Sequence, residues 1–239
     1  MKRKHSGTLL LKSIIYRPYS ELITFFIAWT ITGEIELSIA IGIADLIIKI
    51  FTYFFFDLFW EKFIKVNYSP CVIWLTGLSG AGKTTIANSL LNNLQSNDTK
   101  CIILDGDDIR AVFPTGFDKV SRIKHNISVG EMATLLERQR YVVIVSLVSP
   151  FLEARDKCRE IANNFIEVHI STSLMVCEKR DVKGLYSKAR KGEIKEFTGI
   201  DSPYEPPIHP EVILDTELSD LNFCVRTILN KLKNGRTGK

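Results

Sequence analysis

A glycine-rich segment that ends in lysine and threonine carries the clearest chemistry in this chain. Residues 77–84 read Gly-Leu-Ser-Gly-Ala-Gly-Lys-Thr and match the pattern G-x-x-x-x-G-K-[ST]. Glycines let the backbone curl so that successive N–H groups point at phosphate oxygens, at the positive end of the next helix. Lys83 can then reach the β- and γ-phosphates of ATP, and Thr84 can ligate Mg²⁺. We expect the whole segment to hold the nucleotide: Gly77, Leu78, Ser79, Gly80, Ala81, Gly82, Lys83, Thr84 and Thr85.

The flanks of this segment supply the context that the motif requires. Val72–Leu75 is a short apolar run typical of a buried strand, and apolar residues from Ile86 to Leu94 recur at helical spacing. A glycine-rich turn that merely joins a strand to a helix is the alternative. The strand, loop and helix order favours a nucleoside triphosphate site over it.

Two aspartates follow the next predicted strand, residues 101–104, and could act on a hydroxyl group. Asp105 and Asp107 are two apart, so an extended backbone would point both carboxylates the same way. One of them could deprotonate an attacking hydroxyl or hold the metal through water. Alternatively, Asp108 caps a helix and the others are turn residues. The spacing alone leaves both interpretations open.

The remaining pattern alternates strands and helices. We expect strands at 142–147, 165–170 and 212–214, helices at 120–138 and 153–163, and a last helix that begins near Ser219. Apolar strands in this order predict a parallel sheet covered on both faces, with ligands at the carboxyl ends of the strands. The third strand ends at Ser146 without an aspartate. This absence disfavours a motor or switch NTPase and favours a small-molecule kinase.

From about Pro70 to the last helix, the chain resembles the adenylylsulfate kinases. The similarity rests on GLSGAGKTT, on LDGDDIR at 104–110, on Gly116-Phe117 with Arg122, on Val148-Ser149-Pro150, on Tyr204-Glu205, and above all on RDVKGLYSKARKGEIKEFTGID at 180–201. The resemblance implies an α/β fold of the P-loop nucleoside-triphosphate kinase type. It also implies transfer of a phosphoryl group from Mg-ATP to the 3′-hydroxyl of adenosine 5′-phosphosulfate.

Residue roles follow from the same resemblance. Asp107 is the implied general base, and Lys83 is an implied catalytic cation. Ser149 matches a serine that is described, in this family, as a phosphorylated intermediate. Arg180 falls on the ATP side. The residues implied on the acceptor side are Asp105, Arg110, Phe117, Arg122, Asn126, Val148, Pro150, Lys183 and Phe197.

The stretch 180–200 is basic and carries three glycines, which suits a lid that closes over polyphosphate and excludes water. A solvated basic helix is the alternative interpretation. The glycines that could serve as hinges are Gly184, Gly192 and Gly199.

The chain departs from the family on the acceptor side. His125 stands where the family has asparagine in gapless register, with Asn126 shifted by one, and Phe151-Leu152 follow Ser-Pro in place of an aromatic residue or histidine and then arginine. A kinase for another small nucleotide, such as a cytidine diphosphate derivative, is therefore a second candidate. A non-catalytic membrane adaptor that binds nucleotide is a third.

Composition excludes other classes of function. A net charge of +4 without an arginine-rich stripe argues against nucleic acid as a partner. The five cysteines are scattered without a C-x-x-C pair, which indicates buried, reduced thiols in a reducing compartment.

The first third of the chain differs from the rest. A basic stretch, residues 1–20, precedes an almost continuously apolar one, Leu22–Trp60, which predicts an α-helical membrane hairpin with its turn at Thr32-Gly33-Glu34. It resembles a small uncharacterised family of two-helix bacterial membrane domains. Asp45 and Lys49 are four apart and can pair. The alternative to a membrane-spanning hairpin is an apolar hairpin that packs on the kinase or lies in the membrane interface.

The expected organisation is thus a membrane domain at residues 1–65 and a kinase domain at residues 66–239. Lysines and arginines flank both outer ends of the hairpin, so the positive-inside rule places the kinase on the cytoplasmic side of the membrane. The resemblance also implies a homodimer. A sulfurylase partner is a further expectation, which no residue demonstrates.

Overall fold

The chain divides into two compact units, Met1–Lys65 and Val66–Lys239. The structure is a computed structural model that describes residues 22–63 and 68–234. The basic N-terminus that was predicted to flank the hairpin lies outside these residues.

The first unit is a pair of helices, formed by residues 22–32 and by α2 (Ile35–Phe63). The predicted turn is confirmed: Gly33 has φ +69°, and its N–H donates to the Trp29 carbonyl oxygen over 2.9 Å. Glycine suits this left-handed position at a helix end. The predicted pairing of Asp45 with Lys49 is also confirmed, and Thr24 Oγ1 donates to Asp45 Oδ2 over 3.0 Å, which ties the two helices together.

Most large apolar side chains described in this unit are exposed, among them Phe26, Ile31, Ile48 and Phe51. Among the described residues, no helix is both long enough and apolar enough to cross a membrane.

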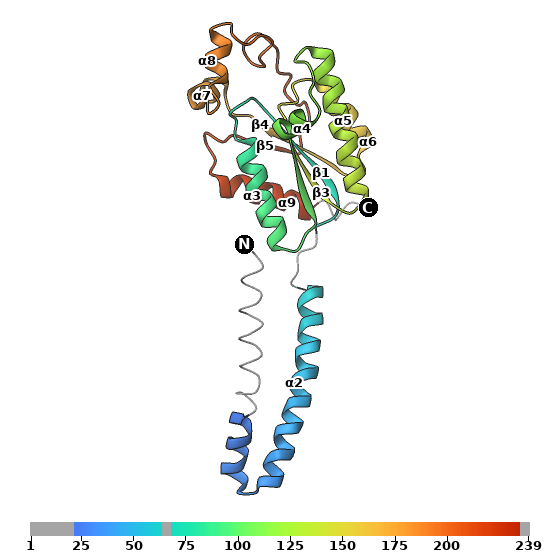
Figure 1. Ribbon diagram of the computed structural model, residues 1–239, viewed down its shortest axis with the longest axis vertical. Coiled ribbons are helices and arrows are strands. Elements are labelled where there is room, and N and C mark those ends of the chain that lie inside the picture. The colour runs from blue at the N-terminus through green and yellow to red at the C-terminus, as the bar shows by residue number, and fades with distance from the viewer. Residues whose placement is uncertain (1–21, 64–67, 235–239) are drawn as a thin grey trace. The chain divides into compact units, whose positions relative to one another are not determined.

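The second unit is built on a parallel sheet of five strands (Figure 1). They are β1 (Cys71–Thr76), β2 (Cys101–Asp105), β3 (Val142–Ser146), β4 (Phe165–Ile170) and β5 (Val212–Leu214), in the order β2-β3-β1-β4-β5. The helices are α3 (Lys83–Ser96), α4 (Gly106–Val112), α5 (Lys119–Arg138), α6 (Leu152–Ile161), α7 (Leu174–Arg180), α8 (Leu185–Arg190) and α9 (Leu221–Asn234).

Helices cover both faces of this sheet (Figure 1). The side chains of β1 point alternately to the two faces and pack against the helices on each. Ile73 and Leu75 pack in one cluster with Leu90 of α3 and Ile228 of α9. Trp74 packs in a second cluster, with residues of α5 and α6. The period of two along a strand sends successive side chains to opposite faces, and a doubly covered sheet buries both sets. The predicted parallel α/β sheet is confirmed.

Two local details differ from what the sequence suggested. The chain does not stay extended after β2, because Gly106 begins α4 and Asp105 is its N-cap, accepting from the Asp107 N–H over 3.0 Å. The alternative in which Asp108 caps a helix is therefore wrong. The last helix begins at Leu221, close to the predicted start near Ser219, but the side chain that accepts the N–H of Phe223, over 2.7 Å, is that of Asp220.

All five cysteines are described, and none is in a disulfide; four are buried and Cys101 is half-buried. The prediction of buried thiols is thus confirmed for four of the five.

Candidate active site

The glycine-rich loop between β1 and α3 adopts a conformation that favours glycine at several positions. Gly77, Gly80 and Gly82 have φ of +149°, +74° and +100°. A Cβ atom on Gly77 would lie 2.5 Å from the Ile170 carbonyl oxygen, so β4 also leaves no room for a side chain there. The loop ends directly at the N-terminus of α3, where backbone N–H groups favour an anion.

Lys83 starts α3 and turns its ammonium group back into the loop. Its Nζ donates to the carbonyl oxygens of Gly77, over 2.9 Å, and Leu78, over 2.8 Å. The side chain is buried, and this burial lowers the pKa of Lys83 from 10.5 to about 8. A buried ammonium group at this place is poised to gain from phosphate charge.

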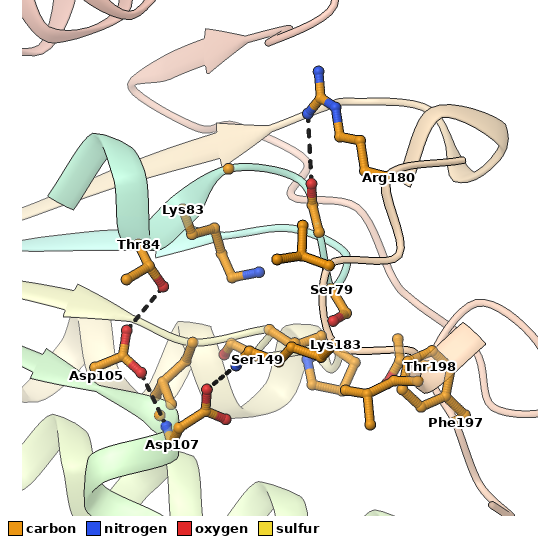
Figure 2. A pocket seen from close by; sticks show the side chains of 18 of the residues that line it. Ser79, Lys83, Thr84, Asp105, Asp107, Ser149, Arg180, Lys183, Phe197 and Thr198 are labelled. Atoms are coloured by element: carbon orange, nitrogen blue, oxygen red, sulfur yellow. Dashed lines mark hydrogen bonds and ion pairs between the residues drawn. The ribbon is translucent and has the colours of Figure 1, made fainter. Parts of the chain in front are cut away.

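Thr84, Asp105 and Asp107 form a chain of polar contacts across the carboxyl ends of the strands (Figure 2). Thr84 Oγ1 donates to Asp105 Oδ2 over 3.0 Å, and Asp105 Oδ1 accepts from the Asp107 N–H. Asp107 itself is exposed and forms an ion pair with Lys183. The two aspartates therefore act differently: Asp105 is held by its neighbours, while Asp107 faces a basic residue of the segment 180–200.

The oxygens of Thr84 and Asp105 fit a magnesium ion, which prefers oxygen ligands. Among the described residues, no group of three or more His, Cys, Asp or Glu side chains could cage a metal.

Arginine and aromatic side chains meet on the other side of the site. The guanidinium groups of Arg110 and Arg122 lie 4.7 and 5.4 Å from the centre of the Phe117 ring. Arg122 is buried, and its Nη1 donates to Thr198 Oγ1 over 2.9 Å. Phe117 is exposed, so an aromatic face and fixed positive charges are both available to a ligand.

Ser149 and Asn126 lie together at the carboxyl end of β3. Ser149 is buried, and its Oγ accepts from Asn126 Nδ2 over 3.1 Å. Its backbone is left-handed, with φ +44°. Ser149 thus has a fixed hydrogen-bond partner from α5.

Arg180 reaches the glycine-rich loop from the end of α7 (Figure 2). Its Nη1 donates to Thr216 Oγ1 over 2.7 Å and to the Gly80 carbonyl oxygen over 3.4 Å, while Nη2 donates to the Thr216 carbonyl oxygen over 3.0 Å. Thr216 Oγ1 also bonds the Ala81 carbonyl oxygen over 2.9 Å. Thr216 was not predicted, because a threonine after a short strand carries no motif.

These groups line one cavity of about 1020 Å³. All the residues predicted for the site line it except Gly77, Leu78 and Ala81, which belong to the same loop. The residues that sequence reasoning missed include Thr198 and Thr216, and Tyr186, whose hydroxyl donates to the Ser79 carbonyl oxygen over 2.9 Å.

The departures from the family pattern lie elsewhere. His125, Phe151 and Leu152 are not among the described residues that line the cavity, whereas Asn126 is. Phe151 is buried in contact with Lys119, whose Nζ lies 5.2 Å from the centre of the phenyl ring. These three positions therefore form no part of the described cavity wall.

A parallel sheet with a phosphate-binding loop, a lysine inside that loop and an aspartate facing it defines a P-loop kinase. Comparison with known proteins makes the class more specific. The sequence profile of the adenylylsulphate kinase family matches residues 69–215. The chain belongs to the adenylylsulphate kinase family.

Individual relatives agree with this assignment. The chain is 48% identical to an adenylyl-sulfate kinase of Gloeothece citriformis over 67% of its length and 92% of the relative. It is 44% identical to one of Marinobacter nauticus over 72% of its length and 89% of the relative. The APS kinase of Mycobacterium tuberculosis, solved in complex with AMPPNP and APS, is 35% identical, with a TM-score of 0.66 over 70% of this chain and 99% of that one.

The N-terminal unit has its own match. Residues 10–61 match a family described as a predicted membrane protein of unknown function. The two units of the chain therefore resemble two separate families.

Proposed function

We propose that this protein transfers the γ-phosphoryl group of Mg-ATP to the 3′-hydroxyl of adenosine 5′-phosphosulfate. The observation that carries the proposal is the single cavity in which Lys83 and Thr84 face Asp107 on one side and the Arg110–Phe117–Arg122 cluster on the other. Membership of the adenylylsulphate kinase family supports the acceptor.

The roles of the residues follow from their positions. Lys83 and the loop N–H groups hold the donor phosphates, and bound Mg²⁺ would neutralise charge on them beside Thr84 and Asp105. Asp107 accepts the proton of the acceptor hydroxyl, and its contact with Lys183 keeps the carboxylate oriented in the cavity. Phe117 stacks on the acceptor base, while Arg110 and Arg122 pair with its acidic groups.

The segment 180–200 would act as the lid over this reaction. Gly184, Gly192 and Gly199 have φ of +64°, +75° and +93°, so each sits where glycine is favoured. Lys183 reaches Asp107 and Arg180 reaches the glycine-rich loop from this segment. Closure would exclude water and protect ATP from hydrolysis.

The test is an acceptor assay with Mg-ATP, with product identity determined by mass. We expect adenosine 5′-phosphosulfate to yield a 3′-phosphorylated product, and AMP and cytidine or uridine diphosphate derivatives to yield little. Asp107→Asn should slow transfer by about 10²–10⁴-fold with ATP binding nearly unchanged, because a general base contributes on this order. Asp108→Asn is the matched control, since Asp108 lies in the same turn but does not line the cavity.

Other results would select the other candidates. Turnover of a different nucleotide alone would mean a kinase of the same fold with another acceptor. ATP binding without transfer to any acceptor would favour the adaptor, in which case Lys83→Ala would leave the cellular role intact.

We further propose that residues 1–65 hold the protein at the membrane as a two-helix hairpin, with the kinase unit on the cytoplasmic side. The exposed apolar side chains of α2 and the match to a predicted membrane family support this. A Glu34→Cys variant should react with a membrane-impermeant maleimide from outside intact cells, whereas the exposed kinase residue variant Glu193→Cys should react only after lysis. Reaction of both only after lysis would contradict a hairpin that crosses the membrane.

The homodimer and the sulfurylase partner stay predictions.

A further inference from the structure

The loop Val148–Pro150, which lines the cavity, is held by a side chain outside it. Arg155 of α6 is 1% exposed. Its Nη1 donates to the Ser149 carbonyl oxygen over 2.5 Å, and its Nη2 to the Glu205 carbonyl oxygen over 2.6 Å. Neither Arg155 nor Glu205 is among the described residues that line the cavity.

A second contact reaches the same loop from the end of β1. Thr76 Oγ1 donates to the Val148 carbonyl oxygen over 2.8 Å, and lies 3.0 Å from the Tyr204 hydroxyl. Because the threonine proton is used on Val148, the tyrosine must donate in this pair. The guanidinium group of Arg155 lies 5.9 Å from the centre of the Tyr204 ring, so both contacts belong to one network.

Glu205 closes the network around the loop. Its N–H donates to the Pro150 carbonyl oxygen over 2.8 Å, and its Oε2 accepts from the Leu152 N–H over 2.8 Å. The backbone that follows Ser149 is thereby bonded to Glu205, which lies far away in the sequence. The backbone before it is bonded to Thr76, whose hydroxyl group meets that of Tyr204.

The loop needs such support because Ser149 has φ +44°, a conformation that non-glycine residues adopt at a cost. In this conformation Ser149 Oγ meets Asn126 Nδ2, and both residues line the cavity. A relaxed loop would move Ser149 and release Asn126. The acceptor side of the cavity would then lose two polar groups with a fixed position.

Stability alone does not account for the network. Arg155 pairs with Glu167 Oε1 over 2.8 Å, and Glu167 is also buried. Removing two charges from water costs so much that apolar residues of similar volume often stabilise a core as well or better. The planar fork of arginine, however, can reach a carboxylate and two carbonyl oxygens in fixed directions, which an apolar side chain cannot.

We propose that Arg155, with Tyr204 and Glu205, is a positioning residue for the acceptor: it fixes Ser149 and Asn126 without touching a substrate. The inference rests on the proposed function, because it assigns these two residues to the acceptor side of a kinase. The donor side has further contacts of its own, through Arg180 and Thr216. The Gly77 N–H also donates to the Val148 carbonyl oxygen, over 3.5 Å, so the two sides touch at that one atom.

The test compares Arg155→Lys and Tyr204→Phe with the parent in the full-length protein. Lysine keeps the charge but cannot make the three bonds, and phenylalanine removes only the hydroxyl group. We expect the KM for the acceptor to rise by about tenfold in Arg155→Lys, the effect of roughly one lost charged hydrogen bond, and less in Tyr204→Phe. The KM for ATP should stay unchanged in both.

Arg159→Lys is the matched control. Arg159 lies on the same helix and bonds the same Glu167, over 3.2 Å, but its other partner is Glu211 and it does not contact the loop. The control should leave both KM values unchanged. Equal changes in the two KM values, or no change in the acceptor KM of either test variant, would overturn the proposal. If Arg155→Lys fails to fold, Tyr204→Phe decides.

Hydrogen exchange provides a readout that needs no turnover. The Leu152 amide should exchange faster in Arg155→Lys than in the parent, while the amides of residues 79–84, none of which bonds this loop, exchange as before. Unaltered exchange at Leu152 would overturn the proposal even if the parent phosphorylates no acceptor. If the parent turns over a nucleotide other than adenosine 5′-phosphosulfate, the proposed function fails, and the same KM comparison with that nucleotide still tests Arg155.

Discussion

Thr216 joins three parts of the donor side with one hydroxyl group. It accepts from Arg180, bonds the Ala81 carbonyl oxygen, and lies 2.8 Å from Thr172 Oγ1. Arg180 therefore stands beside the glycine-rich loop because Thr216 holds both.

Replacing this hydroxyl group should weaken donor binding. Thr216→Val keeps the shape and removes the bonds, so we expect the KM for ATP to rise by about three- to tenfold, on the scale of one hydrogen bond. The acceptor KM should be unchanged. Steady-state kinetics with each substrate varied in turn measures the difference. Thr216→Ser retains the hydroxyl group and should behave as the parent; an equal defect in the serine variant would refute the argument.

Lys83 gives the protein without nucleotide a specific pH dependence. Its pKa is about 8 when folded and 10.5 when unfolded, so between these values the unfolded chain binds the extra proton. The free energy of unfolding that Lys83 contributes therefore rises with pH across this window. Relative to Lys83→Met, the parent should gain about 2 kcal/mol between pH 7 and pH 9.5 in urea unfolding. Parallel pH profiles of the two proteins would contradict the buried ammonium group.

At the scale of elements, Gly199 connects the segment 180–200 to the glycine-rich loop. A Cβ atom on it would lie 3.2 Å from side-chain atoms of both Leu78 and Leu174, whereas one on Gly192 would meet nothing within 4 Å. Both glycines have a positive φ, so alanine at either position costs about 1–2 kcal/mol of backbone strain.

Gly192→Ala is thus a control for the backbone strain of alanine at positive φ. In Gly199→Ala the added methyl group also crowds the Leu78 side chain of the phosphate-binding loop. We expect similar losses of stability in urea unfolding but a larger rise in the KM for ATP in Gly199→Ala. Equal KM values in the two variants would mean that Leu78 absorbs the added methyl group without moving the loop.

The elements also show what the sequence could and could not predict. The strands β1 to β5 were predicted from short, largely apolar runs, and the helical spacing of apolar residues identified α3. Helix α4 was missed because its seven residues bury no side chain and leave no periodic pattern. The site residues were predicted from motifs in the sequence, whereas the contacts of Arg155 with Glu205 and of Thr216 with Arg180 span 50 and 36 residues, and no local pattern encodes them.

On the scale of the whole molecule, the kinase unit has apolar clusters of its own. Among the described residues, the members of these two clusters lie between Tyr68 and Leu232, and the residues that line the cavity belong to the same unit. The match to the Gloeothece citriformis enzyme covers 92% of that relative but 67% of this chain. The matched part of this chain therefore corresponds to nearly the whole of that relative.

Deleting residues 1–65 should separate the kinase activity of the protein from its attachment to membranes. We expect the fragment 66–239 to unfold cooperatively and to keep the KM and kcat of the full chain, because no described residue of the first unit lines the cavity. The full chain should stay with membranes after carbonate extraction, whereas the fragment should not sediment with them. A fragment that folds but has lost acceptor turnover would mean that the N-terminal unit contributes to catalysis. A full chain that carbonate releases would mean that its helices lie on the membrane surface or against protein, since an exposed apolar hairpin in lipid resists extraction.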